Sequence, residues 1–341
     1  MIREAIAKLV EDRPLTAEDA QQTLRDIMGG NATPAQIAAY ITALRIRGES
    51  ADIIAGSARA MREHFTPVER ENEIIIDTCG TGGDGAHTFN LSTAVAFVAA
   101  GAGAVVAKHG NRSVSSKSGS ADVLEALGVN IGVDASVMSR CLREIGIAFL
   151  FAPSLHPAMK HAIGPRREIG IRTIFNILGP LSNPAGAQHG VIGVYSKHLV
   201  PMLAEAAAQL GAKHLFVVHG GDGLDEFTTT GTSFVAEIRD GKIREFELHP
   251  RDAGLPVARA EDLRGGSPAE NAEIIRRIFN GEKFPPRDIV LLNAAAALVT
   301  AQKAPDIKTG IAVAAISIDS GAARKKLEAL IAATKPAGAQ T

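Results

Sequence analysis

The chain carries three polar, glycine-containing segments, each directly after a short apolar run, and the first is suited to binding phosphate. It spans Asp77–Gly85 and precedes an Ala/Val-rich helical stretch. Glycine lets the backbone approach a ligand closely, and the N–H groups at a helix N-terminus attract anions. Asn90–Thr93, at the expected start of that helix, add groups that suit phosphate or a metal ion. The segment matches neither a Walker motif nor a clean dinucleotide fingerprint, and a tight strand-to-helix turn is the alternative.

The second segment, Lys108–Asp122, has the composition of an anion-binding loop. Three fixed cations, several serines and two glycines stand between an apolar run and a helical pattern. A polyphosphate needs this combination of charge, donors and space, whereas a solvated surface loop is the alternative. We expect Ser120 to cap a helix over Ala121–Leu127 that Gly128 ends, so that the helix dipole adds to the positive potential. His109 is either a donor to the substrate or a structural side chain.

The third segment, His219–Glu226, ends in two adjacent carboxylates, Asp225 and Glu226. A hard cation such as Mg²⁺ takes oxygen ligands and bridges carboxylates to a substrate phosphate. A solvated acidic turn has the same composition, but two anion-binding loops elsewhere in the chain favour a metal-bridged phosphate. The spacing does not match an EF-hand.

The elements around these segments predict a helical module followed by an α/β domain. Residues 1–65 show only helical patterns, with start signals at Thr16, Thr33 and Ser50. Strand candidates then alternate with helical stretches, which favours a mainly parallel sheet with helices on both faces. These candidates are Ile74–Ile76, Val105–Ala107, Ala148–Leu150, Val191–Tyr195 and Leu215–Val218.

The rest of the chain predicts a hairpin and then more helices. Asp240 and Gly241 signal an antiparallel hairpin turn, and Ser267 begins a capping box. Loops that follow parallel strands gather at the carboxyl edge of a sheet, where ligands bind in open α/β folds. The three polar segments together therefore predict a site for a large phosphorylated molecule with Mg²⁺.

Composition excludes several other classes of protein. The 341 residues suggest about two domains. With 36 Lys and Arg against 37 Asp and Glu, the net charge is −1, and no overall basic field exists to collect nucleic acid or an anionic membrane. Cys79 and Cys141 are too few for a disulfide framework. The N-terminus is charged and no uncharged apolar run reaches about 18 residues, so a cytoplasmic protein is expected.

Four segments resemble the anthranilate phosphoribosyltransferase family: Asp77–Asp84, Lys108–Gly128, Arg172–Leu181 and Gly221–Glu226. The resemblance implies a helical domain over residues 1–68, joined by helices from about 156–185. It also implies a larger α/β domain of the nucleoside phosphorylase type over residues 69–335 and a tail at 336–341. A homodimer formed mainly through the helical domain is a further implication.

The resemblance also implies a reaction. Members of the family transfer the phosphoribosyl group of 5-phosphoribosyl-1-pyrophosphate (PRPP) to the amine of anthranilate. The products are N-(5-phosphoribosyl)anthranilate and pyrophosphate, in the second step of tryptophan biosynthesis from chorismate. Mg²⁺ assists the departure of pyrophosphate, with two ions expected per subunit.

Matching the family's motifs position by position assigns site residues to this chain. Ser92, Asp225 and Glu226 match metal ligands, and together with Lys108 they are the expected catalytic residues. Gly80, Asn111 and Arg166 match anthranilate contacts. Arg166 is preferred to Arg167 because it stands four residues before Gly170. The expected PRPP contacts are Gly80, Gly83, Asp84, Thr88, Asn90, Leu91, Ser92, Thr93, Lys108, His109, Gly110, Asn111, Arg112, Ser113, Val114, Ser115, Ser116 and Ser120.

Two other functions are compatible with this scaffold. A pyrimidine nucleoside phosphorylase would share the fold and use inorganic phosphate, although its loop motifs differ from Gly80–Asp84. A non-catalytic relative that binds nucleic acid is the second alternative, and the net charge and the pair Asp225-Glu226 argue against it. No convincing nucleophile–His–Asp set is found, which agrees with direct attack by a neutral aromatic amine.

Overall fold

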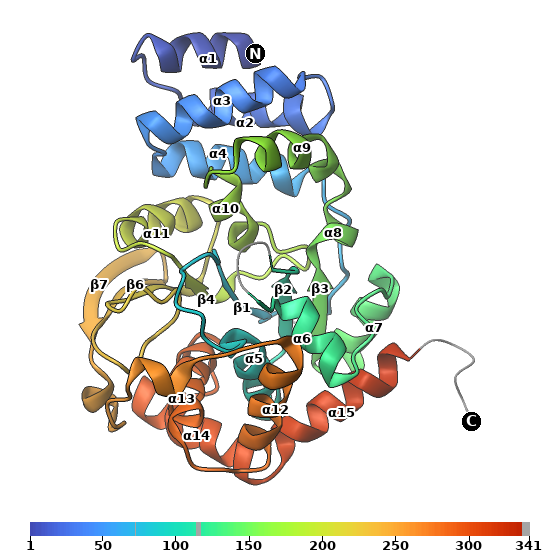
Figure 1. The fold of residues 1–341 in the computed structure, drawn as a ribbon, viewed down its shortest axis with the longest axis vertical. Coiled ribbons are helices and arrows are strands. Elements are labelled where there is room, and N and C mark those ends of the chain that lie inside the picture. The colour runs from blue at the N-terminus through green and yellow to red at the C-terminus, as the bar shows by residue number, and fades with distance from the viewer. Residues whose placement is uncertain (72, 114–116, 336–341) are drawn as a thin grey trace.

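The computed structural model describes residues 1–71, 73–113 and 117–335. A small N-terminal helical domain sits above a larger α/β domain, whose sheet lies in the middle of the molecule (Figure 1). This arrangement confirms the predicted fold class. The predicted PRPP contacts Val114, Ser115 and Ser116 and the predicted tail at 336–341 lie outside the described residues.

Side-chain caps set the starts of three of the N-terminal helices. The helices are α1 (Ile2–Val10), α2 (Ala17–Met28), α3 (Pro34–Arg47) and α4 (Ala51–Arg62). Thr16 accepts a hydrogen bond from the Asp19 N–H while Asp19 accepts one from the Thr16 N–H, which satisfies two donors at the start of α2. Thr33 makes the same reciprocal cap for α3, and Ser50 caps α4. All three predicted helix starts are confirmed.

A later part of the chain returns to the helical domain. It contains α8 (Ala152–Leu155), α9 (Lys160–Ile169) and α10 (Phe175–Leu178). Helix α9 packs on α2 and α3, and α10 packs on α4 (Figure 1). Ala162 and Phe175 from this return segment belong to the same buried apolar cluster as Tyr40. The return segment from α8 to α10 therefore packs against the N-terminal helices.

The sheet has seven strands in the order β3-β2-β1-β4-β5-β6-β7, and the first five of these are parallel. Strands β6 and β7 continue it as the antiparallel hairpin predicted at Asp240-Gly241. From β1 the chain adds β2 and β3 on one side of the sheet and then β4 to β7 on the other. The carboxyl ends of β1 and β4 are therefore the topological switch point, where ligands bind in such sheets. The bounds are β1 (Ile76–Gly80), β2 (Val106–Gly110), β3 (Ile147–Phe151), β4 (His189–Gly193), β5 (His214–Gly220), β6 (Ser233–Arg239) and β7 (Lys242–Leu248).

The strands before all three polar segments extend further than the sequence predicts, which corrects the predicted loop boundaries; β5, for example, includes His219 and Gly220. The apolar pattern places the first strand over Ile74–Ile76, but it runs over Ile76–Gly80 because each of these residues pairs with β4. Likewise Lys108 lies inside β2 rather than in the following loop, and its side chain is buried. Polar residues in these strands break the apolar pattern on which the prediction relies.

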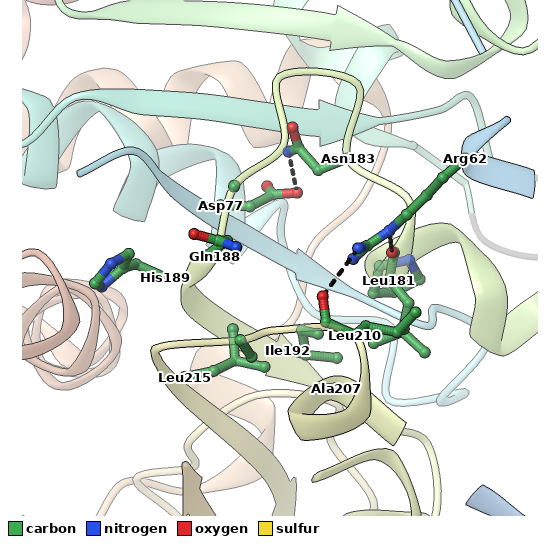
Figure 2. A pocket seen from close by; sticks show the side chains of 13 residues that line it. Arg62, Asp77, Leu181, Asn183, Gln188, His189, Ile192, Ala207, Leu210 and Leu215 are labelled. Carbon is green, nitrogen blue, oxygen red and sulfur yellow. Dashed lines mark hydrogen bonds between the residues drawn. The ribbon is translucent and has the colours of Figure 1, made fainter. Parts of the chain in front are cut away.

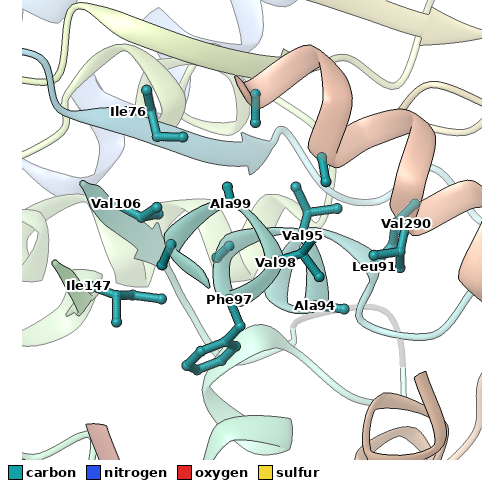
Figure 3. Close-up of a cluster of buried hydrophobic side chains, with 14 of the residues drawn as sticks. Ile76, Leu91, Ala94, Val95, Phe97, Val98, Ala99, Val106, Ile147 and Val290 are labelled. Atoms are coloured by element: carbon teal, nitrogen blue, oxygen red, sulfur yellow. The ribbon is translucent and has the colours of Figure 1, made fainter. Parts of the chain in front are cut away.

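Helices cover both faces of the sheet. On one face α5 (Leu91–Gly101) packs on β1 and β2, and α13 (Pro285–Thr300) packs beside it on β4 and β5, with Phe97 and Val98 in the core (Figure 3). On the other face α11 (Leu199–Gln209) packs on β5 and β6. The remaining helices are α6 (Ser120–Leu127), α7 (Ala135–Glu144), α12 (Pro268–Phe279), α14 (Ile307–Asp319) and α15 (Ala322–Thr334). None of the helices in the described ranges combines the length and apolar character needed to cross a membrane.

Candidate active site

The loops after β1 and β5 meet at the carboxyl edge of the sheet, as predicted. The backbone N–H of Gly82 donates to Asp225 Oδ2 at 2.7 Å, which joins the first and third polar segments. Thr81 is held on its other side, because its N–H donates to the Gly193 carbonyl at 2.9 Å and its hydroxyl accepts from the Tyr195 N–H at 3.1 Å. The glycine-rich loop therefore sits over the switch point between β1 and β4.

Burial and neighbouring negative charge raise the pKa values of Asp225 and Glu226 at this edge. Burial is the main cause that raises the pKa of Asp225 to about 7, and the neighbouring negative charge of Asp84 adds to it. Burial and then the charge of Asp225 raise the pKa of Glu226 well above its usual range, while Lys108 opposes that rise. One buried lysine, Lys108, therefore faces both Asp225 and Glu226 and offsets their negative charge only in part.

This donor set suits a hard divalent cation. The available ligands are carboxylate and hydroxyl oxygens, and a cation would remove the repulsion between the carboxylates. Within the described ranges, no three His, Cys, Asp or Glu side chains are arranged to hold a metal ion by themselves. Mg²⁺ commonly keeps waters and takes oxygens from substrate phosphates, so a site completed by phosphate fits these residues.

Lys108 lies behind the acidic residues and not on the surface. Its side chain is 3% exposed, and Nζ donates to the Thr78 carbonyl at 2.5 Å and to Ser92 Oγ at 3.1 Å. Burial lowers its pKa, whereas the negative charges around it, with Asp77 the strongest, raise it. The lysine therefore places a positive charge and a hydrogen bond directly on one of the predicted metal ligands.

The start of α5 carries the polar groups that the sequence predicts there. Leu91 is its first residue, and Ser92 and Thr93 follow in the first turn. The side chain of Asn90 connects elements: its amide donates to the Ser118 carbonyl at 3.0 Å, and Asn271 on α12 donates to its Oδ1 at 2.9 Å. Asn90 thus fixes the start of α5 against the second loop.

The second loop is held by its own contacts. Arg112 is paired with Asp122 at 2.8 Å and Glu125 at 2.6 Å, so it is turned toward α6. The prediction that Ser120 caps α6 is wrong. Gly119 occupies the N-cap position, and Asp122 accepts its N–H at 2.8 Å. The Ser120 hydroxyl instead donates to the Asn111 carbonyl at 3.2 Å, which turns the loop back on itself, while Gly128 ends α6 as expected.

Arg166 is placed differently from its neighbour Arg167. Its guanidinium lies 5.2 Å from the centre of the Phe175 ring, and burial lowers its pKa. No carboxylate pairs with Arg166 in the described part of the chain, whereas Arg167 is exposed. A partly buried cation without an acidic partner is suited to binding a carboxylate ligand.

His109 and His156 form a buried contact between β2 and the return segment. Their Nε2 atoms are 3.2 Å apart, and Phe65 packs edge-on against His156. Burial lowers the pKa of His109 to about 3 and that of His156 to about 4. The His109 side chain therefore packs inside the fold. His87, in the first loop, is exposed and has a φ of 53°.

Five further residues predicted to contact PRPP lie in or beside the first two loops: Gly83, Asp84, Thr88, Gly110 and Ser113. Gly83 and Asp84 continue the first loop beyond Gly82, and Asp84 accepts the Ala86 N–H at 3.2 Å. Thr88 forms an isolated bridge with Arg264. Gly110 ends β2, and the Ser113 N–H donates to Asp122 at 3.2 Å.

Sequence reasoning missed several residues that hold the site together. Asp77 is buried in β1 and accepts hydrogen bonds from the His109 N–H at 3.0 Å and from Asn183 at 2.7 Å. Arg172 lies over the Tyr195 ring and donates to the Gly83 carbonyl. Arg172 belongs to a segment that the resemblance marked, but nothing in its spacing indicated which side chain mattered.

A small cavity lies away from these loops. It has a volume of about 30 Å³, little more than one water molecule needs, and is lined by Asp77, Asn183 and His189 among others (Figure 2). Arg62 closes it with hydrogen bonds to the Leu181 and Leu210 carbonyls. Because His189 begins β4, this cavity is at the amino ends of the strands, opposite the candidate site.

Comparison with known proteins identifies the family. Residues 3–65 match the helical bundle domain of a glycosyl transferase family, and residues 72–324 match the α/β domain of that family. An anthranilate phosphoribosyltransferase of Anaeromyxobacter sp. (strain K) is 56% identical over 334 residues, which cover 98% of this chain and 99% of that protein.

Solved structures agree with this assignment. The crystal structure of anthranilate phosphoribosyltransferase from Thermus thermophilus is 44% identical with a TM-score of 0.93, covering 97% of this chain and 99% of that one. The enzyme from Saccharomyces cerevisiae in complex with PRPP and Mg is 32% identical with a TM-score of 0.89, covering 98% and 97%. The chain therefore belongs to this glycosyl transferase family and, within it, to the anthranilate phosphoribosyltransferases.

Proposed function

We propose that this protein transfers the 5-phosphoribosyl group from PRPP to the amine of anthranilate, the second step of tryptophan biosynthesis from chorismate. The observation that carries the proposal is the meeting of the glycine-rich loop with Asp225, beside the buried Lys108 and its hydrogen bond to Ser92. This arrangement offers backbone N–H groups for phosphate and carboxylates for a metal at one sheet edge. The high identity to relatives of this name over nearly the whole chain supports the choice of substrates.

The reaction breaks the bond between ribose C1 and the pyrophosphate oxygen and forms a bond from C1 to the anthranilate nitrogen. Pyrophosphate leaves with the bonding electrons, and the amine loses one proton as it attacks. Positive charge develops on the sugar, as at other glycosidic centres. The aromatic amine is neutral near pH 7 and attacks without a strong general base, so the main task of the protein is to orient the substrates and stabilise charge.

PRPP would lie across the first and second loops. Its phosphates would meet the backbone N–H groups at the start of α5, where Ser92 and Thr93 stand. Lys108 holds Ser92 in position through its hydrogen bond and contributes positive charge from behind. Because Arg112 is paired with Asp122 and Glu125, its contribution to PRPP would come through its backbone or through an exchange of partners.

Ser92, Asp225 and Glu226 would hold Mg²⁺, and we propose two ions per subunit. When bound, Mg²⁺ would supply charge neutralisation for the departing pyrophosphate. Asp225 also holds the Gly82 N–H, so this residue shapes the loop as well as offering ligand atoms.

Anthranilate would be oriented by Arg166, and Gly80 and Asn111 are the other proposed contacts. The Arg166 guanidinium would pair with the anthranilate carboxylate in a charge-assisted hydrogen bond. Phe175 supports that guanidinium from one side, so the cation is already partly desolvated before the substrate arrives.

The larger organisation of the enzyme is also part of the proposal. We propose domain limits of 1–68, with helices from about 156–185, and 69–335, with a homodimer formed mainly through the helical domain. PRPP carries several negative charges and does not cross a bilayer unaided, so the enzyme must share the compartment in which PRPP is made. A cytoplasmic location satisfies this requirement.

The decisive experiment is a fluorescence assay of anthranilate consumption with PRPP and Mg²⁺. Consumption that depends on both PRPP and the metal is the expected result. Absence of consumption by folded protein would overturn the proposal. The same preparation should show no phosphorolysis of pyrimidine nucleosides and no retarded band with nucleic acid at low salt. The comparisons support neither of these alternatives.

A further inference from the structure

Arg172 makes two contacts that reach from the return segment to the first loop. Its guanidinium carbon lies 4.4 Å from the centre of the Tyr195 ring. Its Nη2 donates a hydrogen bond to the backbone carbonyl of Gly83. The residue is exposed and is absent from the ion pairs found among the described residues, so its interactions are with the ring and the loop.

The loop that Arg172 contacts has a backbone that is costly to order. Gly82, Gly83 and Gly85 have φ values of 68°, 71° and 73°, in the region that glycine adopts most readily. Glycines lose more conformational freedom on ordering than other residues. A PRPP loop of this kind would therefore bind weakly unless other groups held it in place beforehand.

Four hydrogen bonds hold three successive residues of this loop. Thr81 is bonded to Gly193 and Tyr195 at the end of β4, and the Gly82 N–H is bonded to Asp225. Gly83 is bonded through its carbonyl to Arg172. Tyr195 takes part twice, since its N–H holds Thr81 and its ring supports Arg172.

Arg172 also stands close in sequence to the arginine assigned to anthranilate. Helix α9 carries Arg166 and ends at Gly170, whose φ of 66° turns the chain toward Arg172. The next residue, Thr173, donates its N–H to Asn176 at 2.9 Å and so begins the turn into α10. The first loop is thus tied to the segment that also orients Arg166.

We propose that Arg172 is a positioning residue that holds the Thr81–Gly83 stretch of the first loop ready for PRPP by clamping the Gly83 carbonyl against Tyr195. This role rests on the proposed function, because it assigns PRPP to that loop. The residue has no contact with the reacting atoms in this scheme. Its loss would weaken PRPP binding and leave the chemical step nearly intact.

The test compares Arg172→Ala, Arg172→Lys and Tyr195→Leu with the unchanged enzyme. PRPP with Mg²⁺ is titrated calorimetrically without anthranilate, and KM and kcat are then measured for both substrates. Loss of a charge-assisted hydrogen bond predicts that Arg172→Ala weakens PRPP binding about tenfold and raises the KM for PRPP equally. The kcat should stay within about threefold. Arg172→Lys keeps the charge and a donor and should recover part of the affinity, and Tyr195→Leu should weaken binding less than Arg172→Ala.

Arg277→Ala is the matched control, because Arg277 is also exposed and lies 4.4 Å from an aromatic ring, that of Phe284 directly before α13. It should leave PRPP affinity unchanged. KM does not depend on the amount of folded enzyme, so partial unfolding of a variant would not imitate the effect. The proposal is overturned if Arg172→Ala binds PRPP within about twofold of the unchanged enzyme or lowers kcat without raising the KM for PRPP. If the unchanged enzyme binds PRPP but consumes no anthranilate, the proposed function fails while the titration still decides the role of Arg172.

Discussion

Asp225 occupies the space that a side chain at position 80 would need. A Cβ atom on Gly80 would lie 2.8 Å from Asp225 Cγ and closer still to its carboxylate oxygen. Gly193, which pairs with Gly80 across β1 and β4, is pressed against the backbone carbonyl of Asp225 in the same way. Two glycines at the switch point therefore let a residue from the β5 loop reach across the ends of β1 and β4.

This relationship predicts the effect of Gly80→Ala. The new methyl group must push the Asp225 carboxylate away from the Gly82 N–H, and a displacement of about 1 Å in a catalytic group can lower turnover about 100-fold. We expect a fall of that size in kcat at saturating substrates. The overpacked strand end should also lower the free energy of unfolding by about 1–3 kcal/mol.

The control for this variant is Gly231→Ala, since a Cβ atom at position 231 meets no atom within 4 Å. Its kcat and its urea midpoint should match those of the unchanged enzyme. If Gly80→Ala keeps full activity, catalysis does not need Asp225 to be held against the Gly82 N–H, and the role assigned to this contact is wrong.

The sequence predicts the parts of this fold that depend on neighbouring residues. The capping boxes at Thr16, Thr33 and Ser267 are local patterns, and each begins a helix where expected. The turn at Asp240-Gly241 likewise forms the hairpin of β6 and β7. Such signals need no knowledge of the tertiary structure, because their hydrogen bonds join residues about three positions apart.

What could not be predicted depends on residues far apart in the chain. The local pattern places Lys108 in a loop, and only the buried pairing of β2 with its neighbours explains why a lysine lies inside a strand. Arg112 has the features of a phosphate ligand until α6 brings Asp122 and Glu125 beside it. Arg172 and Tyr195 have no local pattern at all, and only the folded chain joins them to Gly83.

Separate replacement of Arg166 and Arg167 tests which of these adjacent arginines binds the anthranilate carboxylate. Arg166 lies over Phe175 with its guanidinium partly buried, whereas Arg167 is exposed. A charge-assisted hydrogen bond contributes about 1.5–3 kcal/mol, so Arg166→Ala should raise the KM for anthranilate by roughly 10- to 100-fold and that for PRPP much less. Arg167→Ala should change neither KM by more than about threefold. Steady-state kinetics in both substrates measures this, and the reverse ranking would move the assignment to Arg167.

Removing a carboxylate at the sheet edge should change the response to metal. Asp225→Asn and Glu226→Gln each keep the size of the side chain and remove a carboxylate whose pKa is raised by burial and by a neighbouring carboxylate. We expect lower kcat and a higher Mg²⁺ concentration for half-maximal rate in both variants. EDTA should abolish activity of the unchanged enzyme, and added Mg²⁺ should restore it. Identical activity of the variants at every Mg²⁺ concentration would remove Asp225 and Glu226 from the metal site.

The buried pair of His109 and His156 predicts that stability falls as the pH drops below neutrality. Burial lowers the pKa of these two side chains to about 3 and about 4, whereas both would have a pKa near 6.5 in the unfolded chain. At these two side chains the unfolded chain therefore binds more protons than the folded one between pH 6.5 and 4, and their contribution to the free energy of unfolding rises with pH across that window. From pH 7 to pH 5 each histidine should account for a loss of about 2 kcal/mol.

Urea unfolding of the unchanged protein, His156→Gln and His198→Gln at pH 7, 6 and 5 measures this effect. His156→Gln removes one titrating group and should flatten the decline by about 2 kcal/mol between pH 7 and pH 5, even if the variant is less stable at every pH. His198 is exposed and bonds only to Ser196 in the described part of the chain, so His198→Gln should decline in parallel with the unchanged protein. Parallel curves for all three proteins would mean that His156 is free to take up a proton in the folded state, which its 3.2 Å contact with His109 opposes.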